Sequence, residues 1–198
     1  MPQYSVGCKR RIYDTEWFPS MHDPRFELTT LSLTSVDETS ITLAPSNKTH
    51  ASERGIRERR LHANAIILAN GFAVHRWFHP LIITGRDGLT MEDIFKALGG
   101  PQLYRGTALN GFPNLFVLFG PNSFTGHSSV ILGLENQANH AIQLIKPILS
   151  NNAHTIEIKH EPVIKYNNEV QRALEKTIWN SGGCSSWYIT SEGNNSVS

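Results

Sequence analysis

Cysteine and long hydrophobic runs are both scarce in this sequence. Its 198 residues include two cysteines, Cys8 and Cys184, which is too few for a disulfide scaffold or a cysteine-based zinc site. No stretch approaches the roughly 20 apolar residues that cross a bilayer, and the first residues lack the apolar core of a secretory signal. We therefore expect a cytoplasmic chain that holds no metal and inserts into no membrane.

An excess of either charge is also missing. The 18 Lys and Arg residues are balanced by 17 Asp and Glu residues, so the net charge of +1 creates no overall field that attracts nucleic acid. One local basic cluster is interleaved with Glu53 and Glu58 and consists of Arg54, Arg57, Arg59 and Arg60. A solvated hairpin loop is favoured here over a phosphate-binding patch.

The most informative segment runs from Gly111 to Asn122. Its five consecutive apolar residues, 115–119, are flanked by proline and glycine, a pattern typical of a buried parallel strand. At the end of such a strand, Gly120 would let the backbone approach a ligand closely. The N–H groups at the start of the next helix would then face an anionic or carbonyl oxygen.

Helical spacing is clear in three places. Apolar residues recur three and four apart over residues 130–149, where Ser128 or Ser129 can cap the first turn. A shorter helix is predicted over residues 91–98, with Thr90 as its cap and glycines at its end. A third helix is predicted over residues 166–178.

Strand patterns occur before and after these helices. Residues 26–33 and 40–43 alternate apolar and polar side chains around a turn, which predicts a hairpin or meander. Residues 63–69 form a nearly continuous apolar run ending at Asn70 and Gly71, which predicts a second buried strand with a ligand-facing end. Residues 155–159 are a possible edge strand.

These segments together resemble the C-terminal part of class B flavin-dependent monooxygenases, and among them the Baeyer-Villiger monooxygenases. Five segments match family motifs in the family's order: Gly7-Cys8-Lys9-Arg10, Leu68-Ala69-Asn70-Gly71-Phe72, Gly111 to Asn122, Gly126-His127-Ser128-Ser129 with Glu135-Asn136-Gln137, and Trp179-Asn180 with Cys184-Ser185-Ser186-Trp187-Tyr188 and Gly193-Asn194. Each motif alone is weak, whereas five in order are specific.

The resemblance implies an α/β fold, namely an incomplete FAD/NAD(P)-binding doubly wound domain with a β-meander and a small C-terminal helical extension. It places the end of the NADPH domain and a linker at residues 1–25, the C-terminal part of the FAD domain at 26–150, and the extension at 151–198. Asn70 departs from the threonine usual in the family at that position.

The resemblance also implies a reaction. In the family, NADPH reduces FAD, and one oxygen atom of O2 is inserted beside the carbonyl of a ketone. Arg10 would stabilise the anionic oxygenated flavin, because a guanidinium keeps its charge. Lys9 would approach the 2′-phosphate of NADPH.

The other cofactor contacts implied by the resemblance come from backbone turns. Asn70 and Gly71 would face the cofactor, and Gly120, Pro121 and Asn122, with Ser128 at the helix start, would support the flavin. Each has a plainer alternative: Lys9 and Arg10 could be a solvated basic pair, and the glycines could serve only their turns.

The sequence contains no Gly-x-Gly-x-x-Gly turn, although a flavoprotein with two nucleotides needs one for each pyrophosphate. We therefore expect a fragment that acts only with a complementing N-terminal flavoprotein segment. Two alternatives remain: a related N- or S-oxidising flavin monooxygenase, and a non-catalytic remnant acting as a binding module.

Overall fold

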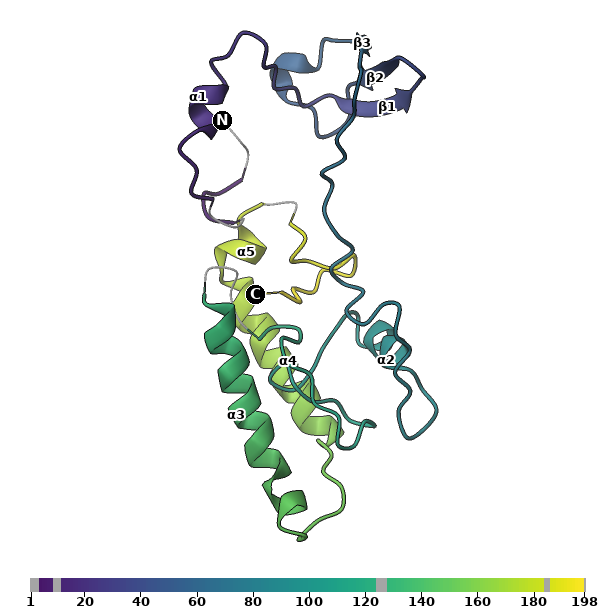
Figure 1. The fold of residues 1–198 in the computed structure, drawn as a ribbon, viewed down its shortest axis with the longest axis vertical. Helices are drawn as coiled ribbons and strands as arrows, with labels where there is room; N and C mark the ends of the chain where they lie inside the picture. Colours follow the sequence, from purple (N-terminus) through teal and green to yellow (C-terminus); the bar gives the residue numbers. More distant parts are fainter. Residues whose placement is uncertain (1–3, 9–11, 124–127, 184–185, 198) are drawn as a thin grey trace. The chain divides into compact units, whose positions relative to one another are not determined.

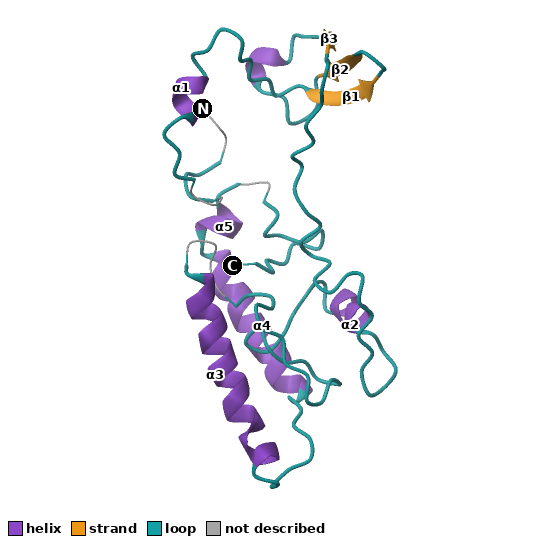
Figure 2. Ribbon diagram, viewed as in Figure 1, coloured by secondary structure: helices purple, strands orange, loops and turns teal. Residues whose placement is uncertain are grey.

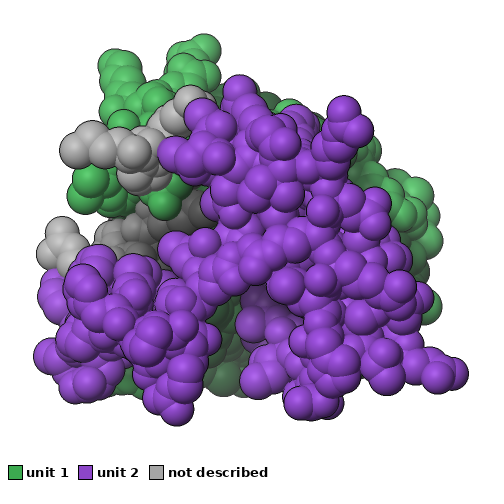
Figure 3. All heavy atoms as spheres, turned by 90° about the horizontal axis from the view of Figure 1, so that it is seen from above, with its two compact units in different colours: residues 1–11, 73–198 green, residues 12–72 purple. Residues whose placement is uncertain are grey.

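The computed structural model describes residues 4–8, 12–123, 128–183 and 186–197 (Figure 1). The chain divides into two compact units, a smaller one of residues 12–72 and a larger one of residues 1–11 and 73–198 (Figure 3). The described part is mixed α/β, with strands in the smaller unit and the long helices in the larger one (Figure 2). Within these described ranges, no helix combines the length and apolar character needed to cross a membrane.

An antiparallel sheet organises the smaller unit. Strands β1 (Ser32–Val36), β2 (Ser40–Ala44) and β3 (Arg59–His62) pair in that order, with Ile41 opposite Leu61. The backbone N–H of Asp37 donates to the carbonyl of Ser40 at 2.8 Å and closes the first hairpin. The predicted hairpin around residues 37–39 and its second strand are therefore confirmed, whereas the first strand lies at 32–36 and not at 26–33. The short helices α1 (Trp17–Ser20) and η1 (Ala51–Glu53) complete the unit.

The basic cluster lies partly on a strand and not wholly in a loop. Arg59 Nη2 donates to Glu27 Oε2 at 2.7 Å, and Arg60 Nη2 lies 3.0 Å from Asp37 Oδ2. Exposed pairs of this kind contribute about 0–1 kcal/mol each. Two of the four arginines thus face carboxylates of their own unit.

Glu53 ties the segment that precedes β1 to the 3₁₀ helix. Its carboxylate accepts hydrogen bonds from the hydroxyls of Thr29 and Thr30 and, at 2.8 Å, from the backbone N–H of Thr30. The hydrogen bond from Thr29 is the largest cause that lowers the pKa of Glu53 from 4.5 to about 2. Hydrogen bonds to the charged form stabilise that form, so folding and ionisation of Glu53 are linked.

The larger unit has its core between α2 (Met91–Ala97), the loops that follow it and α4 (His160–Glu175). Thr90 and Asp93 form a capping box at the start of α2, in which Asp93 N donates to Thr90 Oγ1 at 3.1 Å. The buried core residues are Met91, Phe95, Leu103, Leu109, Phe112 and Val163. The helix predicted at 91–98 is confirmed to within one residue.

Helix α3 (Val130–Leu149) begins and ends where the apolar spacing predicts, and Ser129 caps it by accepting from Leu132 N at 3.4 Å. The third predicted helix is wrong in its bounds, because α4 begins at His160 and ends at Glu175. Ile178 starts a separate short helix, α5 (Ile178–Ser181), after Thr177. The Thr177 hydroxyl donates to the Leu174 carbonyl at 2.7 Å, which satisfies an acceptor at the end of α4.

Three predicted strands do not form. Residues 63–69, 115–119 and 155–159 lie outside every strand of the sheet. Ile67 is 91% exposed and Leu68 is 74% exposed, so the first of these segments is not buried either. The physical reason is the lack of neighbours: in the described part of the chain, no strand lies alongside these segments to accept and donate the ladder hydrogen bonds.

Two cysteines exclude a disulfide scaffold but not a single bond. Cys8 is fully buried and disulfide-bonded. Disulfides are more typical of oxidising compartments. The cytoplasmic location therefore stays a prediction.

Glu53→Gln tests the Glu53 clamp, by which we mean the hydrogen bonds from Thr29 and Thr30 to the Glu53 carboxylate. Because the folded pKa of about 2 lies below 4.5, the carboxylate stabilises the unit fully above pH 4.5, and this contribution is lost as the pH falls toward 2. We expect the wild-type chain to be the more stable near neutral pH, with a difference that shrinks between pH 4.5 and 2. Urea unfolding read by pulsed hydrogen exchange of residues 26–62, with a labelling pulse at fixed pH, measures it.

Glu38→Gln is the matched control, since Glu38 is an exposed carboxylate in the β1–β2 turn. A difference between E53Q and wild type that stays constant as the pH falls would contradict the clamp.

Candidate functional site

The turn of residues 119–123 carries the predicted flavin contacts and has an unusual backbone. Phe119 has φ 66° and Asn122 has φ 53°, both in the left-handed region that non-glycine residues rarely adopt. Gly120 and Pro121 between them are buried. Strained residues persist only where the surroundings hold them, and they gather at functional sites.

Gly120 approaches another loop so closely that a side chain cannot fit. A Cβ at this position would lie 2.1 Å from the carbonyl oxygen of Gly106 and 2.8 Å from Leu103 Cδ1. Gly106 itself has φ 66° and faces the same turn. The close approach thus requires glycine at position 120 for packing within the chain.

Gln137 of α3 joins these two loops. Its side-chain oxygen accepts from Phe119 N at 2.6 Å, and its side-chain nitrogen donates to the Gly106 carbonyl at 3.5 Å. The side chain is buried, so the amide replaces water for both backbone groups. The left-handed turn at Phe119 is therefore fixed by a helix and not by its own sequence.

Asn122 fixes the other end of the turn to the C-terminal segment. Its backbone N–H donates to the Ser196 carbonyl at 3.1 Å, and its side-chain nitrogen donates to the Asn195 carbonyl at 2.9 Å. Asn195 is fully buried and exchanges hydrogen bonds of 2.7 and 3.0 Å with Gln171 of α4. The turn, α4 and the C-terminal segment consequently form one polar network.

The start of α3 completes the site. Its first turn carries no acidic side chain, so the positive end of the helix is not neutralised from within. Val130, Ile131 and Leu132 in this turn are exposed, which gives an apolar surface beside the positive helix end.

The structure brings together only part of the predicted site. Gly120, Pro121 and Asn122 share the turn, and Ser128 is exposed just before α3. Asn70 and Gly71 are exposed and belong to the smaller unit. Two further predicted site residues, Lys9 and Arg10, lie outside the described residues.

Gln137, Asn195 and Ser196 are the site residues that the sequence analysis did not assign. A signal for Gln137 was present, because it lies on the apolar stripe of α3, three residues after Leu134 and four before Ala141. A polar side chain on an apolar stripe indicates a buried hydrogen-bonding role. The C-terminal residues carried no such signal.

Comparison with known proteins identifies relatives of this chain. It is 31% identical over 188 residues to a Baeyer-Villiger monooxygenase of Pseudomonas aeruginosa, covering 95% of this chain and 33% of that protein. It is 30% identical over 197 residues to a Baeyer-Villiger monooxygenase of Streptomyces coelicolor, covering 99% and 35%. The chain is a homologue of the Baeyer-Villiger monooxygenases. No family model matches it.

Solved structures of two monooxygenases share the fold of this chain. An oxidised steroid monooxygenase bound to NADP superposes with a TM-score of 0.75 and 25% identity, over 98% of this chain and 35% of that one. A cyclohexanone monooxygenase from Rhodococcus sp. Phi1 bound to NADP+ has the same TM-score at 22% identity and shares the fold. The chain spans about a third of the length of the relatives it matches.

Gln137→Leu tests whether α3 holds the turn. The substitution removes the acceptor of the Phe119 N–H and the donor to the Gly106 carbonyl, two hydrogen bonds that together typically contribute about 1–3 kcal/mol. We expect a lower free energy of unfolding by this amount, together with faster hydrogen exchange at Phe119. Urea unfolding and exchange mass spectrometry measure the two effects.

Gln143→Leu is the matched control, because Gln143 is exposed on the same helix and its side-chain oxygen accepts from the Lys146 ammonium at 2.8 Å, with no other side-chain hydrogen bond to the described residues. Equal losses in the two variants would show that the amide of Gln137 has no special role.

Proposed function

We propose that the chain is the C-terminal part of a Baeyer-Villiger-type monooxygenase, with the end of the NADPH domain at residues 1–25, the C-terminal part of the FAD domain at 26–150 and an extension at 151–198. The whole enzyme would insert one oxygen atom of O2 into a ketone-type substrate with FAD and NADPH. The chain acts only with a complementing N-terminal segment. The observation that supports this most is the match to Baeyer-Villiger monooxygenases over 95% of the chain but 33% of the relative. The sequence contains neither of the two Gly-x-Gly-x-x-Gly turns that hold the pyrophosphates of FAD and NADPH. The complementing segment would supply both turns.

Two apolar segments that lie outside the sheet support an incomplete doubly wound domain. Residues 63–69 and 115–119 have the composition of buried parallel strands but lie outside the sheet, with Ile67 and Leu68 largely exposed. Exposed apolar area of this kind costs free energy until another part of the protein covers it. The N-terminal segment would supply the missing strands and turn these segments into sheet.

Named residues receive roles within this proposal. FAD, when bound, supplies the activation of dioxygen after reduction by NADPH. Arg10 would hold a fixed positive charge beside the reacting oxygen, and Lys9 would bind the 2′-phosphate of NADPH. The remaining residues orient the cofactors through backbone and hydroxyl groups: Asn70, Gly71, Gly120, Pro121, Asn122 and Ser128.

Two other functions make different predictions. An N- or S-oxidising flavin monooxygenase would bind the same cofactors but oxidise an amine or a sulfide. A non-catalytic remnant would fold and bind a partner without flavin. The matches to proteins named Baeyer-Villiger monooxygenase favour the first proposal over both.

Flavin retention is the direct test. We expect the chain alone to lose FAD on desalting, and the chain co-expressed with the N-terminal two thirds of the Pseudomonas relative to keep a flavin absorbance spectrum. Arg10→Ala in that complex should keep the spectrum but lower ester formation from a ketone about 10²-fold or more, since one charge-stabilising group is lost.

Four results would contradict parts of the proposal. A flavin spectrum retained by the chain alone would show that no complementing segment is needed. No flavin in either preparation would favour the remnant. Full ester formation by the Arg10→Ala complex would remove the catalytic role of Arg10, and oxidation of amines or sulfides alone would favour the alternative enzyme class.

A further inference from the structure

Helix α3 carries a row of apolar residues that the chain leaves largely uncovered, which we call the α3 stripe. Its five residues follow one another in steps of seven, four, three and four: Ile131, Ala138, Ile142, Ile145 and Leu149. Ile131 is 65% exposed, Ile142 is 50% exposed and Leu149 is 73% exposed, whereas Ala138 and Ile145 are half-buried. Apolar residues that line up along a helix in this way are typical of a face that packs against another element.

The α3 stripe is not the face by which the helix packs within its own unit. The buried residues of α3 are Gln137 and Ala141, and Gln137 holds the turn of residues 119–123. At about 100° per residue, this buried face lies about a quarter turn around the helix from the stripe. Helix α3 also lies at the edge of the larger unit in Figure 1. The stripe is therefore available to a partner without displacing the turn.

One charged residue lies among the apolar residues of the stripe. Glu135 is four residues after Ile131 and three before Ala138, so it continues the spacing of four and three that is typical of a seam between two helices. Glu135 is exposed and forms no ion pair with another described residue. A partner that covers this carboxylate has to place a cation beside it, because an unpaired buried charge is costly.

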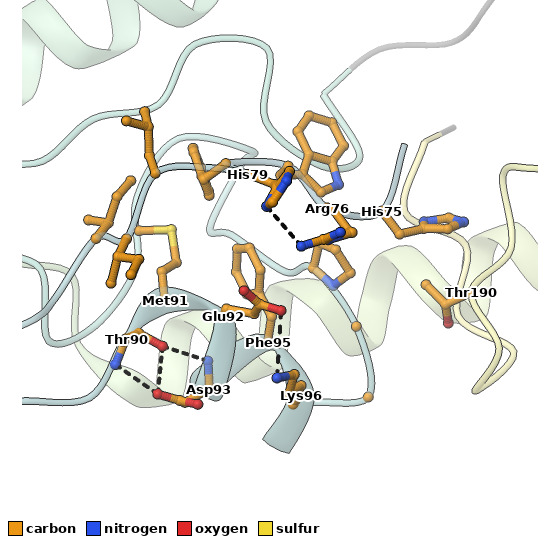
Figure 4. Close-up of a pocket in the computed structure, with 18 of the residues that line it drawn as sticks. His75, Arg76, His79, Thr90, Met91, Glu92, Asp93, Phe95, Lys96 and Thr190 are labelled. Carbon is orange, nitrogen blue, oxygen red and sulfur yellow. Dashed lines mark hydrogen bonds and ion pairs between the residues drawn. The ribbon is translucent and has the colours of Figure 1, made fainter. Parts of the chain in front are cut away.

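That cation does not come from α3 itself. On α2, Glu92 Oε1 lies 3.5 Å from Lys96 Nζ, one turn further along the same helix (Figure 4). On α3, the lysine is Lys146, which lies 11 residues after Glu135 and donates to Gln143 at 2.8 Å. This spacing corresponds to about 16 Å along the helix axis, too far for an ion pair.

The rest of the enzyme is the partner that the comparisons favour. The steroid monooxygenase superposes on 98% of this chain but only 35% of its own length is covered, so most of that protein lies outside the matched fold. In a doubly wound domain, the helices that cover one face of the sheet lie side by side. We infer that a helix of the complementing N-terminal segment docks along the α3 stripe, with apolar residues on Ile142 and Leu149 and a basic side chain beside Glu135. This inference rests on the proposed function and names the surface through which the two parts meet.

Ile142→Glu and Gln143→Glu are a matched pair of variants. Both residues are exposed neighbours on α3 and receive the same side chain, but only Ile142 lies on the stripe. Calorimetric titration of the chain with the N-terminal two thirds of the Pseudomonas relative measures the affinity. We expect Ile142→Glu to weaken binding at least about tenfold, because an apolar contact is lost and a carboxylate is buried. Gln143→Glu should stay within about threefold of the wild-type affinity, as exposed charges contribute little.

Glu135→Lys tests the charge on the stripe. Reversing the charge would place two cations together, so we expect binding at least about tenfold weaker than that of the wild-type chain. Glu135→Gln, which keeps the size of the side chain, should weaken binding less than Glu135→Lys. Unchanged binding by Glu135→Lys would overturn the inference of a basic partner group.

The outcomes separate this inference from the proposed function. Equal weakening by Ile142→Glu and Gln143→Glu would overturn the docking surface and leave the complementing segment in place. No binding of the N-terminal segment by the wild-type chain would overturn both. Sedimentation of the chain alone tests a second copy as the partner: a dimer that Ile142→Glu dissociates, and that the N-terminal segment leaves intact, would also overturn the inference.

Circular dichroism spectra show whether each variant has kept its helices. These titrations measure association without flavin, so a failure of flavin retention does not change their result.

Discussion

The close approach of Gly120 to Gly106 is the constraint on which the site depends. Two backbones come so near that a single methyl group would collide with a carbonyl oxygen at 2.1 Å. Such an approach leaves polar groups without water, and Gln137 compensates by bonding one group on each loop. The left-handed conformations at Phe119 and Asn122 follow from this arrangement, because both residues are held by groups far away in the sequence.

The C-terminal segment belongs to the same hydrogen-bond network as the turn of residues 119–123. Asn195 is fully buried and bonds Gln171 of α4, Asn180 of α5 and Asn122 of the turn. The backbone of Asn195 bonds Gln171 and Asn122, and its side-chain amide donates to Asn180. A buried residue with several such partners fixes their mutual positions, because each lost hydrogen bond would leave a polar group in a dry environment. The helices that follow α3 thereby help to position the turn that we propose as a flavin contact.

The strands of the smaller unit and the apolar segments at 63–69 and 115–119 differ in whether they have neighbouring strands. In the smaller unit, β1 pairs with β2 and β2 pairs with β3, so these strands form ladder hydrogen bonds with one another. Residues 63–69 and 115–119, by contrast, have no strand beside them in the described part of the chain. A continuous apolar run suits a buried parallel strand, but without neighbouring strands it leaves apolar side chains and backbone hydrogen-bonding groups exposed to water. This contrast, together with the coverage of about a third of the relatives, motivates the proposal of a split enzyme.

The sequence by itself determined the features that depend on local chemistry. Periodicity and capping residues located α2 and α3, alternation around a turn located the meander, and the order of motifs identified the family. Tertiary structure decided the rest. Whether residues 115–119 become a strand depends on a neighbouring strand, and none lies beside them in the described part of the chain. The role of Gln137 depends on two loops that meet only in the folded chain. The spacing of apolar and polar residues in a segment indicates its preferred local conformation. That spacing does not show which residue far along the chain will donate a hydrogen bond to the segment or pack against its backbone.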